Sequence, residues 1–312
     1  MRSMHCVCIY HYGGPEMLTC TEAPRPRCGP GEVLVQVHAA GVNPVDWKIR
    51  EGHLKEQLKH TFPLVLGWDV SGAITETGPG TSRLKTGDEV FSRPDLLRDG
   101  AYAEFIVIKE SEVARKPRTL DHVHAAALPL AGLAAWQSLV EAAQLASGQR
   151  VLIHAAAGGV GSLAVQLAKT RGAYVVATAS ARNHDYLRGL GADEIIDYEH
   201  MRFEDLAPAM DVVLDTIGGD TQERSWKTLK PGGILVSLVS PPSTDTAAKL
   251  GLRQAFVFVQ PHAAQLEAIA DLVDAGKLKS NVETILPLSE AKRAHVLSQG
   301  GHTRGKIVLQ IV

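Results

Sequence analysis

The sequence predicts an α/β protein in which a β-rich N-terminal region is followed by a doubly wound parallel sheet. Over roughly the first 120 residues, turn residues separate short stretches that alternate apolar and polar side chains, such as residues 31–37 (GEVLVQV) and 101–108 (AYAEFIVI). From about Val123 onward, short apolar segments alternate with amphipathic helical ones. Strand–helix–strand units of this spacing are typical of a parallel sheet covered by helices.

The second half of the chain supplies the elements of this sheet in order. Residues 123–146 are rich in Ala and Leu and predict a helical segment. The predicted strands are residues 151–155, 174–179, 194–197, 211–215, 234–239 and 254–259. The predicted helices are residues 162–171, 182–190 and a segment around 266–273. Residues 306–312 (KIVLQIV) predict a last strand, whose place periodicity alone does not determine.

Composition excludes several classes of protein. The 312 residues are 45% hydrophobic and 21% charged, so a core can form without disulfides or metals. A formal net charge of -2 provides no electrostatic attraction to nucleic acid or an anionic membrane. The four cysteines lack CxxC spacing, and no apolar run approaches the roughly 20 residues that span a bilayer. The start of the chain has no apolar signal segment, so we expect a cytoplasmic protein.

A glycine-rich octet, residues 154–161 (HAAAGGVG), follows the first predicted strand of the sheet. Aligned with G-x-G-x-x-G, it has Ala156, Gly158 and Gly161 at the three glycine positions. Small residues are needed because a pyrophosphate approaches the backbone, and the next helix directs its N–H groups and positive dipole end at the anion. Because a strand precedes the octet and a helix and second strand follow, it predicts a dinucleotide site rather than an ordinary turn.

The end of the second strand indicates which dinucleotide binds. NAD-specific sites place Asp or Glu about 20 residues beyond the glycines, where it holds the ribose 2′-hydroxyl. Residues 178–183 (TASARN) contain no carboxylate, and the first one is Asp185. Ser180 and Arg182 instead suit a 2′-phosphate, and one charge-assisted contact favours NADPH by about tenfold to hundredfold. The alternative is that Arg182 is only a solvated residue at the start of a helix.

Several segments resemble the zinc-independent quinone oxidoreductases, the zeta-crystallin-like family of the medium-chain dehydrogenase/reductase superfamily. The longest, residues 155–173 (AAAGGVGSLAVQLAKTRGA), looks like the cofactor turn and helix of that family. The others are GVNPVD at 41–46, GWDVSG at 67–72, GDEV at 87–90, GAYAEF at 100–105, LPLAGLAAWQ at 128–137, DTIGG at 215–219 and RGK at 304–306. Each is weak alone, but together they extend over nearly the whole chain.

The resemblance implies a bipartite fold, with an active site between the domains, and a homodimer. It implies a GroES-like catalytic domain at residues 1–121, a Rossmann NADPH-binding domain at 122–266 and a C-terminal return to the catalytic domain at 267–312. The implied cofactor contacts are Asn43 beside the nicotinamide; Ala157, Gly158, Gly159, Val160 and Gly161 at the pyrophosphate; Ser180, Arg182 and Tyr198 at the 2′-phosphate and adenosine ribose; Leu238, Phe256 and Val257 near the nicotinamide end; and Arg304 near the phosphates. In one departure, Ala134 replaces a threonine whose hydroxyl commonly contacts the cofactor in the family.

The residues that would bind a catalytic zinc are replaced. Where zinc alcohol dehydrogenases of the superfamily carry a cysteine and a GHE segment, this chain has Asp46 and Gly67-Trp68-Asp69. Tryptophan offers a metal no lone pair, and a catalytic zinc needs three protein ligands. Residues 91–99 contain no cysteine for a structural zinc, and the 13 histidines include no HExxH. We therefore expect no metal site.

The absent metal limits the substrate class. Without a Lewis acid a simple ketone is poorly polarised, whereas a quinone or conjugated enone delocalises the charge that hydride transfer creates. The sequence thus predicts hydride transfer from NADPH to a quinone or α,β-unsaturated carbonyl, with Asn43, Lys48 and Tyr102 as candidate catalytic donors to the oxyanion. The competing roles are a turn cap for Asn43, a solvated residue for Lys48 and core packing for Tyr102. Enoyl-thioester reduction on the same scaffold, and a non-catalytic NADPH-binding redox sensor, stay open as alternatives.

Overall fold

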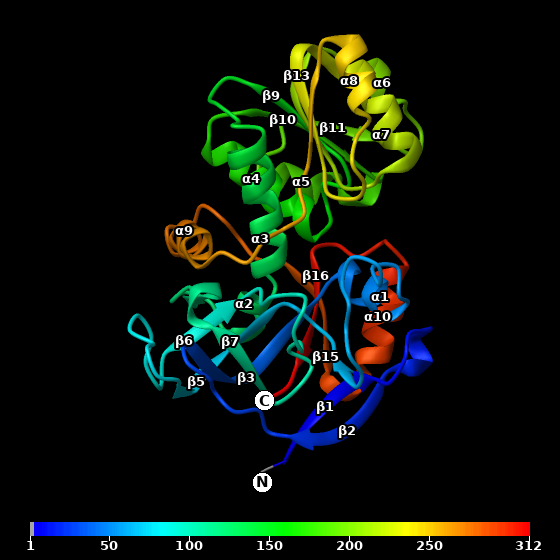
Figure 1. Cartoon of the computed structure of the whole chain (residues 1–312). Helices are drawn as coiled ribbons and strands as arrows, with labels where there is room; N and C mark the ends of the chain where they lie inside the picture. Colours follow the sequence, from blue (N-terminus) through cyan, green and yellow to red (C-terminus); the bar gives the residue numbers. More distant parts are fainter. Residues whose placement is uncertain (1–2) are drawn as a thin grey trace. The chain divides into compact units, whose positions relative to one another are not determined.

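The structure is a computed structural model that describes residues 3–312, and the chain divides into two compact units (Figure 1). Unit 1 comprises Met1–Leu130, Gln260–Ala275 and Ser280–Val312, and unit 2 comprises Ala131–Val259 and Gly276–Lys279. The chain thus leaves unit 1 twice, after Leu130 and again after Ala275, and returns to it each time. The boundary predicted at residue 122 falls at the start of helix α2 (His122–Ala126), which packs on strands of unit 1.

Unit 1 is built on two sheets. The larger has the order β15-β16-β3-β5-β6-β8, with β7 also paired to β3. Its last strand in sequence, β16, runs antiparallel to β3 with Ile307 opposite Val42. The smaller sheet has the order β2-β1-β4. The strands are β1 (Ser3–Ile9), β2 (Thr19–Pro24), β3 (Glu32–Val42), β4 (Leu64–Val65), β5 (Val70–Thr77), β6 (Glu89–Ser92), β7 (Phe105–Lys109), β8 (Val113–Arg115), β15 (Val282–Pro287) and β16 (Lys306–Gln310).

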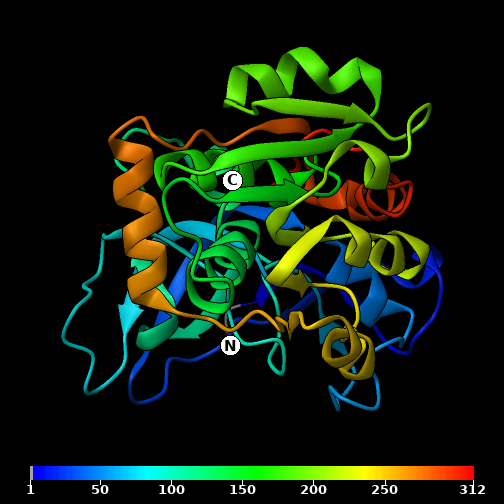
Figure 2. The ribbon, with the colours of Figure 1, turned by 90° about the horizontal axis from the view of Figure 1, so that it is seen from above.

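Helices and a large apolar core complete unit 1. The core gathers inward-facing residues of both sheets around Trp68 and Tyr102, neither of which is exposed. Helix α9 packs on β8, and α10 packs on α1 and β16. The helices, with α9 and α10 in orange and red in Figures 1 and 2, are α1 (Pro44–Arg50), α2, α9 (Ala263–Asp274) and α10 (Ala291–Gln299).

Unit 2 is a six-stranded parallel sheet in the order β11-β10-β9-β12-β13-β14. This is the 3-2-1-4-5-6 order of a doubly wound Rossmann fold, so the predicted fold class is confirmed. Figure 2 shows the strands and their connecting helices from above. The strands are β9 (Arg150–Ile153), β10 (Tyr174–Ala179), β11 (Glu194–Asp197), β12 (Met210–Asp215), β13 (Leu229–Ser237) and β14 (Arg253–Phe256). The helices are α3 (Pro129–Trp136), α4 (Gly159–Thr170), α5 (His184–Leu190), α6 (Phe203–Leu206), α7 (Gly219–Ser225) and α8 (Thr244–Leu250).

The segment predicted as helical, residues 123–146, is helical over most of its length but is divided into separate pieces. The chain forms α2, then α3, then a π-helical segment, Gln137–Ala142. Pro129 explains the first break, because it lacks an N–H group and disfavours helical geometry in the residue before it. Strands β1, β2 and β15 and helices α1 and α10 were not predicted, since their short or mixed patterns lack clear periodicity.

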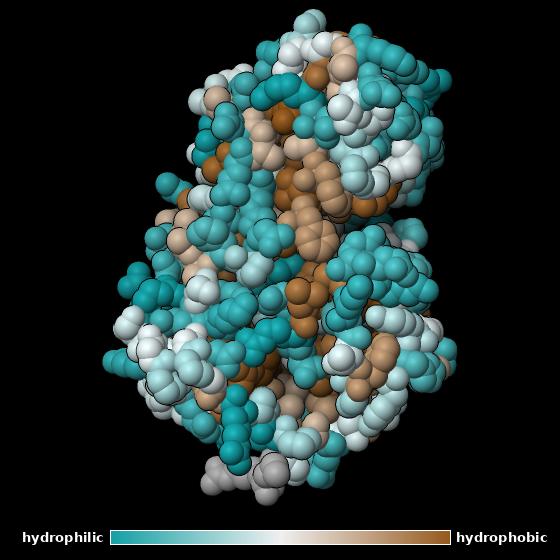
Figure 3. Space-filling view, viewed as in Figure 1, coloured by the Kyte–Doolittle hydropathy of each residue, from teal (hydrophilic) through white to brown (hydrophobic). Residues whose placement is uncertain are grey.

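The surface is polar over most of the face drawn in Figure 3, with small hydrophobic groups between hydrophilic ones. Among residues 3–312, every helix is too short or too polar to cross a lipid bilayer. The largest exposed apolar side chains of β14 and the segment after it are Phe256 and Phe258, which are 39% and 42% exposed.

Candidate dinucleotide site and active site

The glycine-rich octet forms the turn from β9 into α4, with Gly158 as the N-cap of the helix. A β-carbon on Gly161 would lie 2.4 Å from the carbonyl oxygen of Ala155, so only glycine allows helix and turn to pack this closely. A β-carbon on Gly158 would only reach ordinary contact with the Ala155 carbonyl oxygen, at 3.4 Å, so that position is uncrowded. The first N–H groups of α4 have no acceptor within the helix and are available to an anion.

A buried histidine fixes the start of this turn. His154 contacts Thr178 Oγ1 through Nδ1 at 3.1 Å and Ser225 Oγ through Nε2 at 2.9 Å. Burial lowers the pKa of His154 to about 4, so the ring is neutral at physiological pH. The backbone N–H of Ala156 also donates to the carbonyl of Thr178 at 3.1 Å. The turn is therefore tied to the end of β10 as well as to β9.

The ends of β10 and β11 bring three predicted cofactor residues to one edge of the sheet. Ala179 pairs with Asp197, so Ser180 and Tyr198 follow on adjacent strands. Ser180 is nearly buried and accepts a hydrogen bond from Asn183 Nδ2 at 3.2 Å, whereas Arg182 and Tyr198 are exposed. No carboxylate occurs between Ala179 and Asp185. This edge can therefore hold a dianionic group without a repelling acid on β10.

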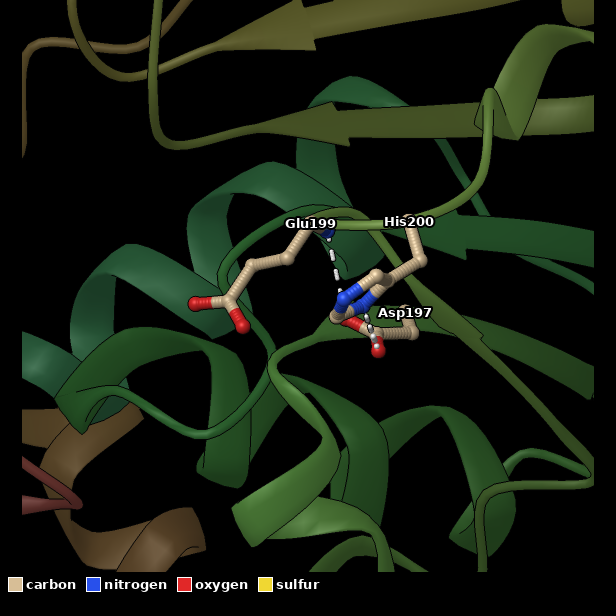
Figure 4. Close-up of side chains that lie close together, drawn as sticks. All are labelled: Asp197, Glu199 and His200. Atoms are coloured by element: carbon tan, nitrogen blue, oxygen red, sulfur yellow. Dashed lines mark hydrogen bonds and ion pairs between the residues drawn. The ribbon is translucent and has the colours of Figure 1, made fainter.

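In the turn after β11, Asp197, Glu199 and His200 lie close together (Figure 4). Asp197 accepts the Glu199 backbone N–H at 3.1 Å and the His200 ring at 2.8 Å, one bond on each carboxylate oxygen. The hydrogen bond to His200 lowers the pKa of Asp197, and the same bond raises the pKa of His200. Asp197, Glu199 and His200 have ligand-type atoms within 4.8 Å of one another, but both oxygens of Asp197 already have partners. We assign this group to the shape of the turn.

Loops at the other strand ends are organised by Asp215, which is fully buried at the end of β12. One of its oxygens accepts the N–H groups of Ile217 and Gly218 at 2.9 and 2.8 Å. The other accepts Ser237 Oγ at 2.8 Å. Backbone hydrogen bonds hold two predicted contact residues: Leu238 N–H donates to the carbonyl of Asp215 at 3.0 Å, and Val257 N–H donates to the carbonyl of Ser237 at 2.9 Å. Phe256 precedes Val257 at the exposed end of β14.

In unit 1, three strand ends bring a buried polar cluster together around Asn43. Lys306 begins β16 opposite the end of β3, and Asp69 precedes β5, which also pairs with β3. The ammonium of Lys306 donates to Asn43 Oδ1 and, at 3.0 Å each, to Asp69 Oδ2 and the carbonyl of Val42. Asn43 Nδ2 donates to Asp69 Oδ2 at 2.8 Å. A β-carbon on Gly41 would lie 2.8 Å from that same oxygen, so glycine makes room for the carboxylate.

A second chain of hydrogen bonds reaches Asn43 from helix α10. Arg50 lies 3.0 Å from His295 Nδ1 and can only donate, so His295 carries its proton on Nε2. That nitrogen lies 3.3 Å from the hydroxyl of Tyr102, which donates to Asp46 Oδ2 at 2.9 Å. The same oxygen of Asp46 accepts the backbone N–H of Asn43 at 2.8 Å. The candidate catalytic residues Asn43 and Tyr102 thus meet at one carboxylate.

Burial determines the protonation states of the residues in this chain of hydrogen bonds. Burial raises the pKa of Asp46 to about 7, and Asp46 Oδ1 is buried without a hydrogen-bond partner. Burial also lowers the pKa of His295 to about 3 and raises the pKa of Tyr102 well above its usual value. Both rings are therefore neutral at physiological pH, and Asp46 titrates near it.

The remaining predicted residues are Lys48, Ala134 and Arg304. Lys48 is half-buried on α1, with its ammonium 5.7 Å from the centre of the Trp47 ring and no hydrogen-bond or ion-pair partner among the described residues. Burial lowers its pKa. Ala134 is buried in α3 of unit 2. Arg304 belongs to unit 1, where its backbone N–H donates to Glu283 at 2.8 Å.

Sequence reasoning did not select three of the buried residues at this site as functional. Lys306 and Asp69 appeared only within RGK and GWD segments, and His295 was not singled out at all. The sequence did carry one indication of these residues, because a charged side chain is unusual beside an apolar strand. Lys306 is the first residue of such a strand, and Asp69 directly precedes another. A charged residue at a strand end becomes informative only when its partners are known.

Comparisons with known proteins agree with both units. Residues 29–118 match the family model described as "Alcohol dehydrogenase GroES-like domain", and residues 190–309 the one described as "Zinc-binding dehydrogenase". A mouse relative, "NAD(P)H oxidoreductase RTN4IP1, mitochondrial", is 35% identical over 91% of this chain and 82% of its own. The tomato "2-methylene-furan-3-one reductase" is 36% identical over 89% of this chain and 71% of its own.

A solved structure matches along the entire length. The quinone oxidoreductase from Coxiella burnetii superposes with a TM-score of 0.93 at 35% identity, covering 100% of both chains. This likeness, the two family models and the relatives agree on one assignment. The chain is an oxidoreductase that belongs to the quinone oxidoreductase-like family of the medium-chain dehydrogenase/reductase superfamily.

Proposed function

We propose that this protein is an NADPH-dependent, zinc-free oxidoreductase that reduces a quinone or an α,β-unsaturated carbonyl. The observation that carries the proposal is the uncrowded amino end of α4 at the glycine turn, beside a strand edge with Ser180 and Arg182 and no acid before Asp185. When bound, NADPH supplies a hydride from C4 of its nicotinamide. The residues around it bind and orient the cofactor and stabilise the charge that develops on the acceptor.

The cofactor contacts divide by unit. In unit 2 we propose that the backbone of Ala157, Gly158, Gly159, Val160 and Gly161 binds the diphosphate, with its negative charge at the positive end of α4. Ser180, Arg182 and Tyr198 bind the 2′-phosphate and adenosine ribose, and Leu238, Phe256 and Val257 line the nicotinamide end. In unit 1, Asn43 is a contact of the nicotinamide, and Arg304 a weaker contact of the phosphates.

The side chains at the positions of the zinc ligands do not fit a metal. Trp68 is fully buried, and its Nε1–H donates to the carbonyl of Arg98 at 3.1 Å, so the ring offers no lone pair. Asp46 Oδ2 is occupied by the Asn43 N–H and the Tyr102 hydroxyl. The ammonium of Lys306 already neutralises Asp69. We therefore propose catalysis without zinc, and derive no step through a metal.

The acceptor class follows from the donors that remain. Asn43 and Lys48 are the candidate donors to the oxyanion, because Asn43 Nδ2 has one N–H group beyond its bond to Asp69 and Lys48 has no acidic partner. The hydroxyl hydrogen of Tyr102 is used by Asp46, so we propose that Tyr102 acts by holding Asp46. Such donors suffice for an acceptor that delocalises charge, and the tomato relative is named for an enone substrate. Water supplies the proton.

Turnover of a substrate panel with NADPH tests the proposal. We expect oxidation of NADPH with a small quinone and with an unsaturated ketone, and little with a saturated ketone. Preference for a crotonyl thioester over the free enone would replace the proposal by enoyl-thioester reduction. Saturable NADPH binding without turnover of any acceptor would replace it by a redox-sensing role.

Two further proposals concern assembly and location. We propose a homodimer, as the family resemblance implies, which sedimentation velocity of the purified chain tests. We also propose a cytoplasmic location, although the mouse relative is named as mitochondrial. Fractionation of the native cells tests this, and recovery in an organelle would contradict it.

A further inference from the structure

We propose that Lys306 and Asp69 are positioning residues that hold the Asn43 carboxamide in one orientation and polarise it as a hydrogen-bond donor. This inference rests on the proposed function and assigns a role to two residues outside its donor set. The three side chains come from three different strand ends and are at most 6% exposed. Lys306 and Asp69 both form hydrogen bonds with the carboxamide of Asn43.

The contacts leave one orientation for the amide. Asn43 Oδ1 faces the Lys306 ammonium, which can only donate, and Asn43 Nδ2 faces Asp69 Oδ2, an acceptor, at 2.8 Å. Rotating the amide by half a turn would place an N–H group against an ammonium and an oxygen against a carboxylate. Both contacts would then be repulsive in a buried setting, where an unmade charged hydrogen bond costs most. The flipped state is therefore excluded.

The same contacts determine which group can act. Lys306 has three N–H groups and three acceptors, namely Asn43 Oδ1, Asp69 Oδ2 and the carbonyl of Val42, so its ammonium has none left for a substrate. Asn43 Nδ2 has two N–H groups, and only one is used, by Asp69. Withdrawal of electron density through Oδ1 by the ammonium makes the remaining N–H a stronger donor. The buried cation therefore acts through Asn43 and not by direct contact.

The backbone of Asn43 is fixed independently. Its N–H donates to Asp46 Oδ2 at 2.8 Å, and Asp46 in turn accepts from Tyr102. The residue is thus held at its backbone by Asp46 and at its side chain by Lys306 and Asp69. Asn43 is thus held in place before the reaction begins. A hydrogen-bond donor that is preorganised in this way stabilises the negative charge on the acceptor without having to rearrange.

The experiment compares Lys306→Met/Asp69→Asn with the wild type, each with and without Asn43→Ala. The paired substitution removes both charges together, so that no buried charge is left unpaired. We expect kcat to fall by about tenfold to hundredfold, as for loss of a charge-assisted hydrogen bond. We expect NADPH affinity, measured by fluorescence titration, to change by less than about threefold, since α4 is untouched. In the Asn43→Ala background the same paired substitution should change kcat by less than about twofold.

A matched control separates positioning from stability. Lys116 is another buried lysine of unit 1, ion-paired with Glu89 at 3.4 Å and hydrogen-bonded to the carbonyl of Pro117 at 3.1 Å. Lys116→Met should lower the melting temperature and leave kcat of the folded fraction unchanged. Full kcat in Lys306→Met/Asp69→Asn, or an equal loss with and without Asn43, would overturn the inference. A wild type without turnover would instead defeat the proposed function.

Discussion

Gly161 of helix α4 lies directly against Ala155 of the preceding turn, with room for a hydrogen atom but not for a methyl group. A β-carbon there would stand 2.4 Å from the Ala155 carbonyl oxygen and 2.6 Å from Cα of Ala156, both rigid backbone atoms. We expect Gly161→Ala to destabilise the protein by about 1–3 kcal/mol, as overpacking does, and to weaken NADPH binding by displacing the turn. Urea unfolding and fluorescence titration measure the two effects.

Gly158→Ala is the matched variant for this prediction. Its β-carbon meets only the Ala155 oxygen, at 3.4 Å, and Gly158 has an ordinary extended backbone as the helix N-cap. We expect the folding free energy to change by less than about 1 kcal/mol, while the methyl group obstructs the approaching diphosphate and lowers NADPH affinity. Unchanged affinity in Gly158→Ala would place the diphosphate elsewhere.

Cofactor preference is expected to depend on Arg182. Removing a cation from the 2′-phosphate should cost about tenfold to hundredfold in NADPH affinity, and little in NADH affinity, because NADH has no phosphate there. Arg182→Ala is compared with Arg188→Ala, an exposed arginine of α5 that pairs with Asp185 at 2.6 Å. Dissociation constants for both nucleotides give the answer. An equal loss of NADH and NADPH affinity in Arg182→Ala would remove this side chain from the 2′-phosphate site.

Much of the dinucleotide site was predictable because its signals are local in sequence. Strands predicted at residues 174–179 and 194–197 coincide with β10 and β11, and β10 is the nearly continuous apolar run expected of a buried parallel strand. The glycine spacing is likewise local, because Gly161 packs against Ala155 and Ala156 in the turn directly before its helix. Short right-handed connections then restrict the possible orders of the parallel strands.

The polar cluster of unit 1 could not be predicted in the same way. Lys306 and Asn43 are 263 residues apart, and Tyr102 and His295 are 193 apart. Their proximity depends on the docking of β16 and α10 onto the N-terminal sheet, which the periodicity of those segments does not specify. Asp46 illustrates the consequence: its residue type was noted as a missing zinc ligand, but its neighbours Tyr102 and Asn43 required the fold.

Removal of metal ions is expected to leave activity unchanged. Trp68 donates its only ring N–H to Arg98, and Lys306 neutralises Asp69, so the cluster offers zinc no complete ligand set. After dialysis against a chelator, the protein should contain well under one zinc per chain and should reduce its acceptor at the original rate. Loss of turnover that zinc restores would contradict zinc-free catalysis. Zinc binding at the turn formed by Asp197, Glu199 and His200, without an effect on rate, would not contradict zinc-free catalysis, because these residues are not part of the polar cluster.

The raised pKa of Asp46 predicts an unusual dependence of stability on pH. In the unfolded chain this carboxyl ionises near its usual pKa of 3.8, whereas in the folded protein it holds its proton to about pH 7. Between these values the unfolded state binds fewer protons, so this residue's contribution to the free energy of unfolding falls as pH rises, and is constant above pH 7. The full change is on the order of 4 kcal/mol. His154 and His295, whose folded pKa values are lowered to about 4 and 3, act in the opposite direction as pH falls below 6.5, so the total profile mixes both signs.

Comparison of the wild type with Asp46→Asn isolates this contribution, because the histidines are common to both. Asparagine still accepts the Asn43 N–H through its oxygen but does not ionise. We expect urea unfolding at pH 5, 6, 7 and 8 to show the variant gaining stability relative to the wild type up to about pH 7, and a constant difference above it. Asp185→Asn, at a carboxylate whose side chain is 98% exposed, should show no such trend. A difference between wild type and Asp46→Asn that does not vary with pH would mean that Asp46 is ionised throughout, and that its orphaned oxygen is stabilised by a partner such as bound water.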